Sequence, residues 1–381
     1  MKMKALQQLL ATLDVKIKEG PFKIVHPMFG AINTMLFTPG HGTTTGPHIR
    51  DAIDMKRFMG IVIFALVPSI LVGSYNVGAQ AGVEGLFAAF MFGFLKLLPI
   101  IVVTYAVGLG WEMIFGHING HDIHEGFLVT GILLPLTLPP TIPLWQVAVA
   151  VSFGTVIGKE VFGGTGMNLL NPALTARAFL FFTYPGNISG DSVWVAVDGF
   201  TGATPLAAAA ASTGPAVEAL NNAGFSFNDM FFGFVPGSIG ETSTIAILIG
   251  AAILLITGVG SWRIMLATTL GAYGMALIVQ FFGGDVAGGM RSLPAHYHLM
   301  MGGFMFGMVF MATDPVSAAG TNAGKWVYGI LIGVMVILIR VFNPAYPEGM
   351  MLAILFGNVF SPLIDHFVVQ SNIKRRLNYG K

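Results

Sequence analysis

The residues best suited to carry a bound group form one short run, Asp198-Gly199-Phe200-Thr201-Gly202-Ala203-Thr204-Pro205. Its two glycines allow the backbone to approach a bulky ligand closely, because glycine has no Cβ atom. Thr204 ends the run with a hydroxyl group, and Asp198 adds a nearby carboxylate. An ordinary glycine-rich turn has the same composition, so these residues alone are compatible with a binding loop or with a simple turn.

A second glycine-rich stretch, Gly163-Gly164-Thr165-Gly166, is followed by Asn168 and Asn171. Asparagine side chains can bond the carbonyl and nitrogen edges of a flavin ring, and glycines expose amide donors. Asn171 also stands directly before Pro172, which predicts the N-cap of a helix. The two roles are compatible with each other. The stretch lacks the preceding strand that a dinucleotide-binding fingerprint requires.

Three carboxylates, Glu112, Asp314 and Asp365, lie at or inside apolar segments. An acid within a membrane is costly unless it is paired, which makes each one a candidate for ion handling, and sodium prefers such oxygen ligands. The alternative is a helix end, since Glu112 closes an apolar segment and Asp314 precedes a proline. The chain has no cysteine, so thiolate and iron–sulfur sites are excluded, and we predict no metal site.

These residues need a membrane scaffold to position them. Of the 381 residues, 54% are hydrophobic and only 10% are charged, whereas a soluble domain carries about 25% charged residues. We therefore predict an all-α integral membrane protein with about ten transmembrane helices of about 20 residues each. The predicted spans are 58–75, 86–110, two within 126–158, 172–184, 242–262, 264–284, 297–313, 326–342 and 349–368.

Positive charge predicts the orientation. Lysine and arginine favour cytoplasmic loops, and residues 185–240 contain neither, which places this long loop outside. Residues 1–55 then form a cytoplasmic N-terminal extension to a membrane domain at 56–381, and both termini lie inside. Five spans in each half, with Asn171-Pro172-Ala173 echoed by Asn343-Pro344-Ala345, suggest two inverted five-helix repeats.

The run that ends at Thr204 resembles the flavinylation motif Asp-Gly-x-Ser/Thr-Gly-Ala-Thr of one membrane-protein family. That family comprises the NqrB component of the sodium-translocating NADH:quinone reductase and the RnfD component of the Rnf complex. The resemblance covers nearly the whole chain, including residues 125–131, 159–166 and 372–377. The extension of 55 residues is similar to NqrB rather than to its Rnf counterpart.

The resemblance implies two flavins. A separate flavin transferase would join the Thr204 hydroxyl to FMN through a phosphoester, with Asp198, Gly202 and Ala203 as part of the motif. A non-covalent riboflavin is also implied. Its candidate ligands are Lys159, Thr165, Asn168 and Asn171.

The resemblance also implies a quinone site and an ion path. Gly108, Glu125 and Phe127 are where it places ubiquinone, and it links Glu112, Asp314 and Asp365 to sodium. The protein would then be an electron-transport component of a six-subunit translocase in the bacterial inner membrane. Electrons from NADH would pass over its flavins to ubiquinone and drive sodium export, with no nucleic-acid partner. An Rnf-type component, or a transporter or channel without redox chemistry, remains the alternative.

Overall fold

The computed structural model describes residue 46 and residues 55–119, 126–197, 202–283, 288–343 and 346–379. Within these ranges the secondary structure is helical and contains no β-strand. The predicted extension at 1–55 lies almost entirely outside the described residues, as do Asp198 and Glu125. The all-α prediction is confirmed for the described part of the chain.

The first half of the chain forms five apolar helices: α3 (Met55–Gln80), α4 (Leu86–Asn119), α5 (Gly126–Leu136), α6 (Leu144–Val156) and α7 (Pro172–Thr183). The proline-rich residues 137–143 separate α5 from α6, as predicted, because proline removes a backbone donor and breaks the helical ladder. A short 3-10 turn, η2 (Glu160–Phe162), leads from α6 into the glycine-rich stretch.

Four short helices follow between the two halves: α8 (Pro185–Ile188), α9 (Pro205–Ala211), α10 (Ala216–Asn222) and α11 (Phe227–Phe232). Local sequence fixes their ends. Ser226 and Asp229 form a capping box at the start of α11, and Gly233 ends it with a φ of 95°, a backbone conformation that favours glycine.

The second half contains α12 (Thr244–Ile256), α13 (Trp262–Gly283), α16 (Asn322–Phe342) and α17 (Met350–Tyr379). Between α13 and α16 the chain is broken into η3 (Met290–Ser292), α14 (Ala295–Met300), α15 (Phe304–Phe306) and a π-helical turn, η4 (Gly307–Met311). The interruption falls at Gly302, whose φ is 63°. A π-helical turn is uncommon and often accompanies a functional site.

Six helices are long and apolar enough to cross a membrane, which identifies a multi-pass membrane protein. They are Lys56–Gln80, Leu86–Asn119, Leu144–Phe162, Trp262–Gly283, Asn322–Phe342 and Met350–Asn378. Each of the ten predicted segments contains helix, but the prediction of ten full spans is not confirmed. The reason is length: α5 and α12 have 11 and 13 residues, and at about 1.5 Å per residue they reach only part of a hydrocarbon layer about 30 Å thick.

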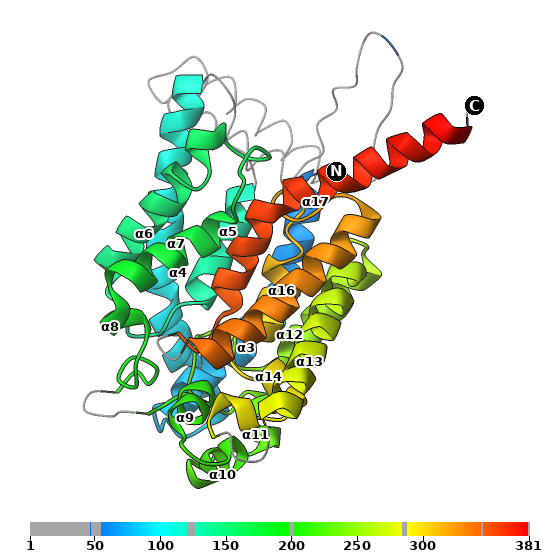
Figure 1. The fold of residues 1–381 in the computed structure, drawn as a ribbon. Helices are drawn as coiled ribbons and strands as arrows, with labels where there is room; N and C mark the ends of the chain where they lie inside the picture. Colours follow the sequence, from blue (N-terminus) through cyan, green and yellow to red (C-terminus); the bar gives the residue numbers. More distant parts are fainter. Residues whose placement is uncertain are drawn as a thin grey trace, which may run out of the picture.

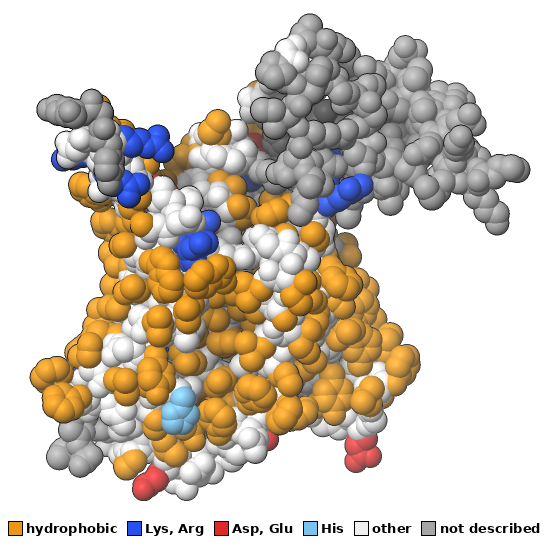
Figure 2. Space-filling view, turned by 90° about the vertical axis from the view of Figure 1, so that its right-hand side faces the viewer, with side chains coloured by type: hydrophobic (Ala, Val, Ile, Leu, Met, Phe, Trp, Pro, Cys, Tyr) orange, Lys and Arg blue, Asp and Glu red, His pale blue; other side chains and the backbone are white. Residues whose placement is uncertain are grey.

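The long helices run side by side, with α8–α11 and α14 gathered near one end of the bundle (Figure 1). Helix α3 packs against α12, and α7 packs against α17, so the first and the last helices of the two halves meet each other. Figure 2 shows a broad hydrophobic surface with Lys and Arg side chains towards one end and Asp and Glu mainly at the other. Large side chains such as Phe64 and Phe281 are exposed on that apolar surface.

Candidate functional site

Thr204 stands at the N-terminus of α9, where the chain turns from an extended to a helical conformation. Its φ and ψ are −71° and 157°, and its Oγ1 accepts a hydrogen bond from the Ala207 amide at 3.2 Å. Pro205 occupies the first helical position, where a missing N–H costs nothing. The sequence therefore fixes the position of the Thr204 side chain, which is half-buried.

Thr204 lines the first of three cavities, which encloses about 880 Å³ of empty space including its open mouth. Aromatic and sulfur-containing side chains, Phe181, Trp194 and Met230 among them, form much of its wall. The hydroxyl of Thr242 also lines it and finds no hydrogen-bond partner among the described residues. A buried hydroxyl without a partner is costly, which fits a cavity built to hold a ligand.

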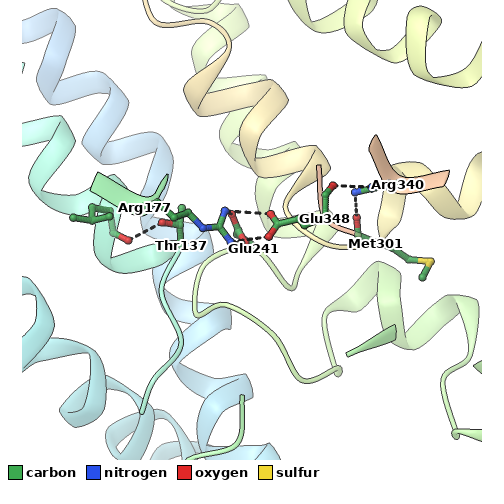
Figure 3. Close-up of polar contacts among 7 residues, drawn as sticks. Thr137, Arg177, Glu241, Met301, Arg340 and Glu348 are labelled. Carbon is green, nitrogen blue, oxygen red and sulfur yellow. Dashed lines mark hydrogen bonds and ion pairs between the residues drawn. The ribbon is translucent and has the colours of Figure 1, made fainter. Parts of the chain in front are cut away.

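The floor of this cavity carries a charged group that we call the Arg177 clamp, defined as Arg177, Glu241 and Glu348 (Figure 3). Arg177 Nη1 donates to Oε1 of both glutamates at 3.1 Å. Its Nη2 donates to Glu241 Oε2 at 3.3 Å and to Glu348 Oε2 at 2.9 Å. The exposed fractions of the three side chains are 5%, 6% and 16%. One guanidinium thus bridges two carboxylates in a site that water barely reaches.

Arg340 holds the segments around the clamp in place. Its guanidinium is buried and donates to three backbone carbonyls, those of Glu348, His298 and Met301. Gly303 leaves room for the carboxylates, because a Cβ atom there would lie 2.5 Å from Glu348 Oε1 and 2.6 Å from Glu241 Oε1. Arginine is suited to such forked, buried contacts because its guanidinium is planar and always charged.

Burial raises the pKa of the Glu241 carboxyl to about 8, and the neighbouring Glu348 carboxylate raises it further, while Arg177 acts in the opposite direction. Glu241 lies in the segment between α11 and α12. Sequence reasoning missed the clamp, although a signal existed: Arg177 interrupts an apolar segment, and charges in such segments are rarely idle.

The four residues predicted to bind riboflavin, Lys159, Thr165, Asn168 and Asn171, line one cavity of about 730 Å³. The N-cap prediction for Asn171 is also confirmed, because its Oδ1 accepts from the amides of Ala173 at 3.0 Å and Leu174 at 3.3 Å. Asp314, which lies in the second half of the chain, lines the same cavity. The structure thus joins the glycine-rich stretch to a distant predicted ion-path residue.

Hydrogen bonding within this second cavity is incomplete. Asn168 Nδ2 donates to the Leu170 carbonyl at 3.0 Å, whereas the buried Thr165 hydroxyl has no hydrogen-bond partner among the residues that the structure describes. A ligand with carbonyl or ring-nitrogen acceptors would satisfy that hydroxyl. The donor set therefore fits the edge of a flavin ring.

Glu112 and Lys159 form a buried ion pair that links α4 to the residue before η2. Glu160 Oε1 lies 3.8 Å from the same ammonium nitrogen. The structure thus joins a predicted ion-path residue to a predicted riboflavin residue, which spacing in the sequence did not indicate.

The other two predicted ion-path carboxylates are hydrogen-bonded within the chain. Asp314 accepts from Ser317 Oγ at 2.7 Å and from the Val316 amide at 3.3 Å. Asp365 accepts from the amides of Gly320 at 2.6 Å and Thr321 at 3.0 Å, and also from the Thr321 hydroxyl. These contacts tie α17 to the segment that starts α16.

Gly108 and Phe127, two of the predicted quinone residues, are in direct contact. A Cβ atom on Gly108 would lie 1.7 Å from Phe127 Cζ, so only glycine fits beside this ring. Phe127 is buried and lines a third cavity of about 180 Å³, and Tyr105 packs edge-on against it at 6.3 Å. Glu125 lies outside the described residues.

Comparison with known proteins follows the same residues. The NQR2, RnfD, RnfE family matches residues 42–374 of the chain. An Ectopseudomonas mendocina protein, named as the NqrB component of a Na(+)-translocating NADH-quinone reductase, is 51% identical, covering 94% of this chain and 95% of its own. The proteins of that name from Azotobacter vinelandii and Pseudomonas aeruginosa are 51% and 50% identical over the same shares.

Proposed function

The chain belongs to the NQR2, RnfD, RnfE family, and on this premise we propose that it is the NqrB component of a sodium-translocating NADH:quinone reductase. About half of all positions are identical to relatives of that name across almost the full length of both chains. An Rnf-type component belongs to the same family and differs in its electron partners. A transporter or channel without redox chemistry would account for the helices but leaves the Thr204 motif unexplained.

The observation that carries the proposal is the position of Thr204 on the wall of the first cavity. Its hydroxyl oxygen would carry the FMN phosphate after a flavin transferase has acted. Phe181 and Trp194 would pack against the ring, and the Thr242 hydroxyl would meet one of its polar atoms. A bound flavin supplies reversible electron transfer that protein side chains cannot, while the chain fixes its position and surroundings.

The second cavity would hold a non-covalent riboflavin. Lys159, Thr165, Asn168 and Asn171 line it together, and the Thr165 hydroxyl awaits an acceptor. Since Asn171 Oδ1 already caps α7, its amide nitrogen is the part of the side chain that we assign to the ligand. The cavity volume of about 730 Å³ lies within the range of about 300–1,000 Å³ for small-molecule sites.

Ubiquinone would bind beside Gly108 and Phe127, with Glu125 as the polar anchor. The close contact of Gly108 with the Phe127 ring supports this assignment, because it shapes a narrow apolar wall next to a small cavity. A quinone site needs such an apolar slot with one or two polar groups.

Sodium export would use Glu112, Asp314 and Asp365, and coupling requires that electron transfer change the affinity or access of the ion. Asp365→Asn tests this role against that of a structural anchor. If Asp365 handles the ion, its change raises the sodium concentration for half-maximal turnover, whereas Thr321→Val, which removes one anchoring hydroxyl, does not. Equal effects of both changes would assign Asp365 to anchoring alone.

The architecture that we propose is two inverted five-helix repeats in the bacterial inner membrane, with both termini in the cytoplasm. The contacts of α3 with α12 and of α7 with α17 support the repeats, because equivalent helices meet at a pseudo-two-fold axis. The gathering of Lys and Arg at one end supports the orientation. The α9 end then faces outside, and the other five components of the complex would surround the apolar faces.

In-gel flavin fluorescence of the denatured chain, co-expressed with a flavin transferase, tests the proposal. We expect a fluorescent band for the wild type, none for Thr204→Ala, and a band for Thr201→Ala, which changes the other threonine of the same motif. A dark wild-type band would remove the flavoprotein assignment and favour the transporter alternative.

A further inference from the structure

The Arg177 clamp is the one charged feature of the first cavity that the proposed function leaves without a role. All three residues line the cavity that Thr204 lines. They come from α7, from the segment before α12 and from the segment before α17, so three distant parts of the chain supply one buried charged floor. A stabilising role alone would not require charges, since buried ion pairs are often no more stable than apolar packing.

The charges around Glu241 can be counted from every segment packed on it. Arg177 contributes one positive charge, and Glu241 and Glu348 contribute one negative charge each when ionised. Arg340 stands behind the Glu348 backbone and is occupied by three carbonyl groups. Tyr346 and His298 are the remaining titratable neighbours of the cluster, and burial lets neither carry a charge easily. The ionised clamp therefore carries one net negative charge, which Arg340 offsets from the side away from Glu241.

We propose that the Arg177 clamp sets the reduction potential of the flavin carried on Thr204. This inference rests on the proposed function, since it requires the flavin to be present. Adding an electron to the flavin adds negative charge inside a cavity of low dielectric constant. Arg177 stabilises that charge, the two glutamates oppose it, and together they hold the guanidinium rigidly from both sides.

The direction of the effect follows from the charge that a substitution removes. Glu241→Gln keeps the size and one acceptor atom but removes a negative charge, so the flavin becomes easier to reduce. A unit charge about 10 Å away, at an effective dielectric constant of about 20, changes an equilibrium about tenfold. For one electron this is about 59 mV.

Spectroelectrochemical titration of the purified complex measures this shift at about pH 9, above the pKa of about 8 at which Glu241 ionises. We expect the ratio of reduced to oxidised flavin at fixed potential to rise about tenfold in Glu241→Gln. At about pH 6 the shift should largely vanish, because wild-type Glu241 is then protonated. Glu218→Gln is the matched control, since Glu218 is exposed and does not line the cavity.

Two further variants protect the test from misfolding. Glu348→Gln removes the other negative charge of the clamp and should shift the ratio in the same direction. Arg177→Gln combined with Glu241→Gln restores the net charge and should return the ratio to within about threefold of the wild type.

The outcomes separate the two proposals. A wild-type chain without covalent flavin contradicts the proposed function itself. Flavin present in every variant, with potentials that do not move at about pH 9 in either glutamine variant, overturns the role of the clamp and leaves the flavin on Thr204 intact.

Discussion

The ion pair between Glu112 and Lys159 yields the sharpest stability prediction. Lys159 is 4% exposed, and both Glu112 and Glu160, which lies 3.8 Å from its ammonium group, are 2% exposed. Lys159→Met removes the cation that serves Glu112 and leaves a charge buried in an apolar setting. Removing one partner of a buried pair costs about 3–5 kcal/mol.

The reverse substitution should cost less. Glu112→Gln leaves Lys159 beside Glu160, so the ammonium group keeps a carboxylate within ion-pair distance. The cost is then that of a lost charged hydrogen bond, about 1–3 kcal/mol. The double variant removes both charges of the pair and should recover at least about 2 kcal/mol of the loss in Lys159→Met.

Thermal unfolding in detergent, followed by tryptophan fluorescence, measures these differences. At about 2 °C per kcal/mol for a large chain, Lys159→Met should lower the midpoint by about 6–10 °C and Glu112→Gln by about 2–6 °C. Lys374→Met, at an exposed lysine near the end of α17, should change it by less than about 1 °C. A Lys159→Met midpoint within about 2 °C of the wild type, or a larger loss in Glu112→Gln, would refute the reasoning.

Two other substitutions test the quinone and riboflavin assignments. Gly108→Ala should displace the Phe127 ring and reduce quinone-dependent turnover by about tenfold or more, whereas Gly110→Ala, with no atom within 4 Å of its added Cβ, should leave turnover unchanged; equal turnover in both variants would contradict the assignment. Thr165→Val should lower the riboflavin retained after purification by about fivefold or more, the loss of one hydrogen bond of about 1 kcal/mol. Thr268→Val removes a buried hydroxyl, also without a described partner, that lines none of the three cavities, and retention as low in this variant would exclude a specific role for Thr165.

Local features of the fold were predictable from the sequence. The prolines at 139, 140 and 143 end α5 and separate it from α6, and Asn171 followed by Pro172 caps α7. The four predicted riboflavin residues lie close to one another along the chain, so a single turn of glycine-rich backbone brings them to one cavity. Such features depend on neighbouring residues alone, which is why pattern reasoning finds them.

Features that depend on long-range contacts were not predictable. Arg177 meets Glu241 across 64 positions and Glu348 across 171, and no spacing in the sequence records those distances. Asp365 reads as an isolated carboxylate until the structure places Thr321 beside it, 44 residues earlier. The short lengths of α5 and α12 were also missed, because an apolar composition does not tell where a helix ends inside the protein.

The central claim is that the Thr204 hydroxyl carries FMN at the wall of the first cavity, and mass spectrometry of the peptide that contains residues 198–206 tests it most directly. The chain is purified after co-expression with a flavin transferase and digested, and the modified residue is located by fragmentation. We expect an added mass equal to FMN less one water, located on Thr204. An unmodified peptide, or the same added mass on Thr201, would contradict the account.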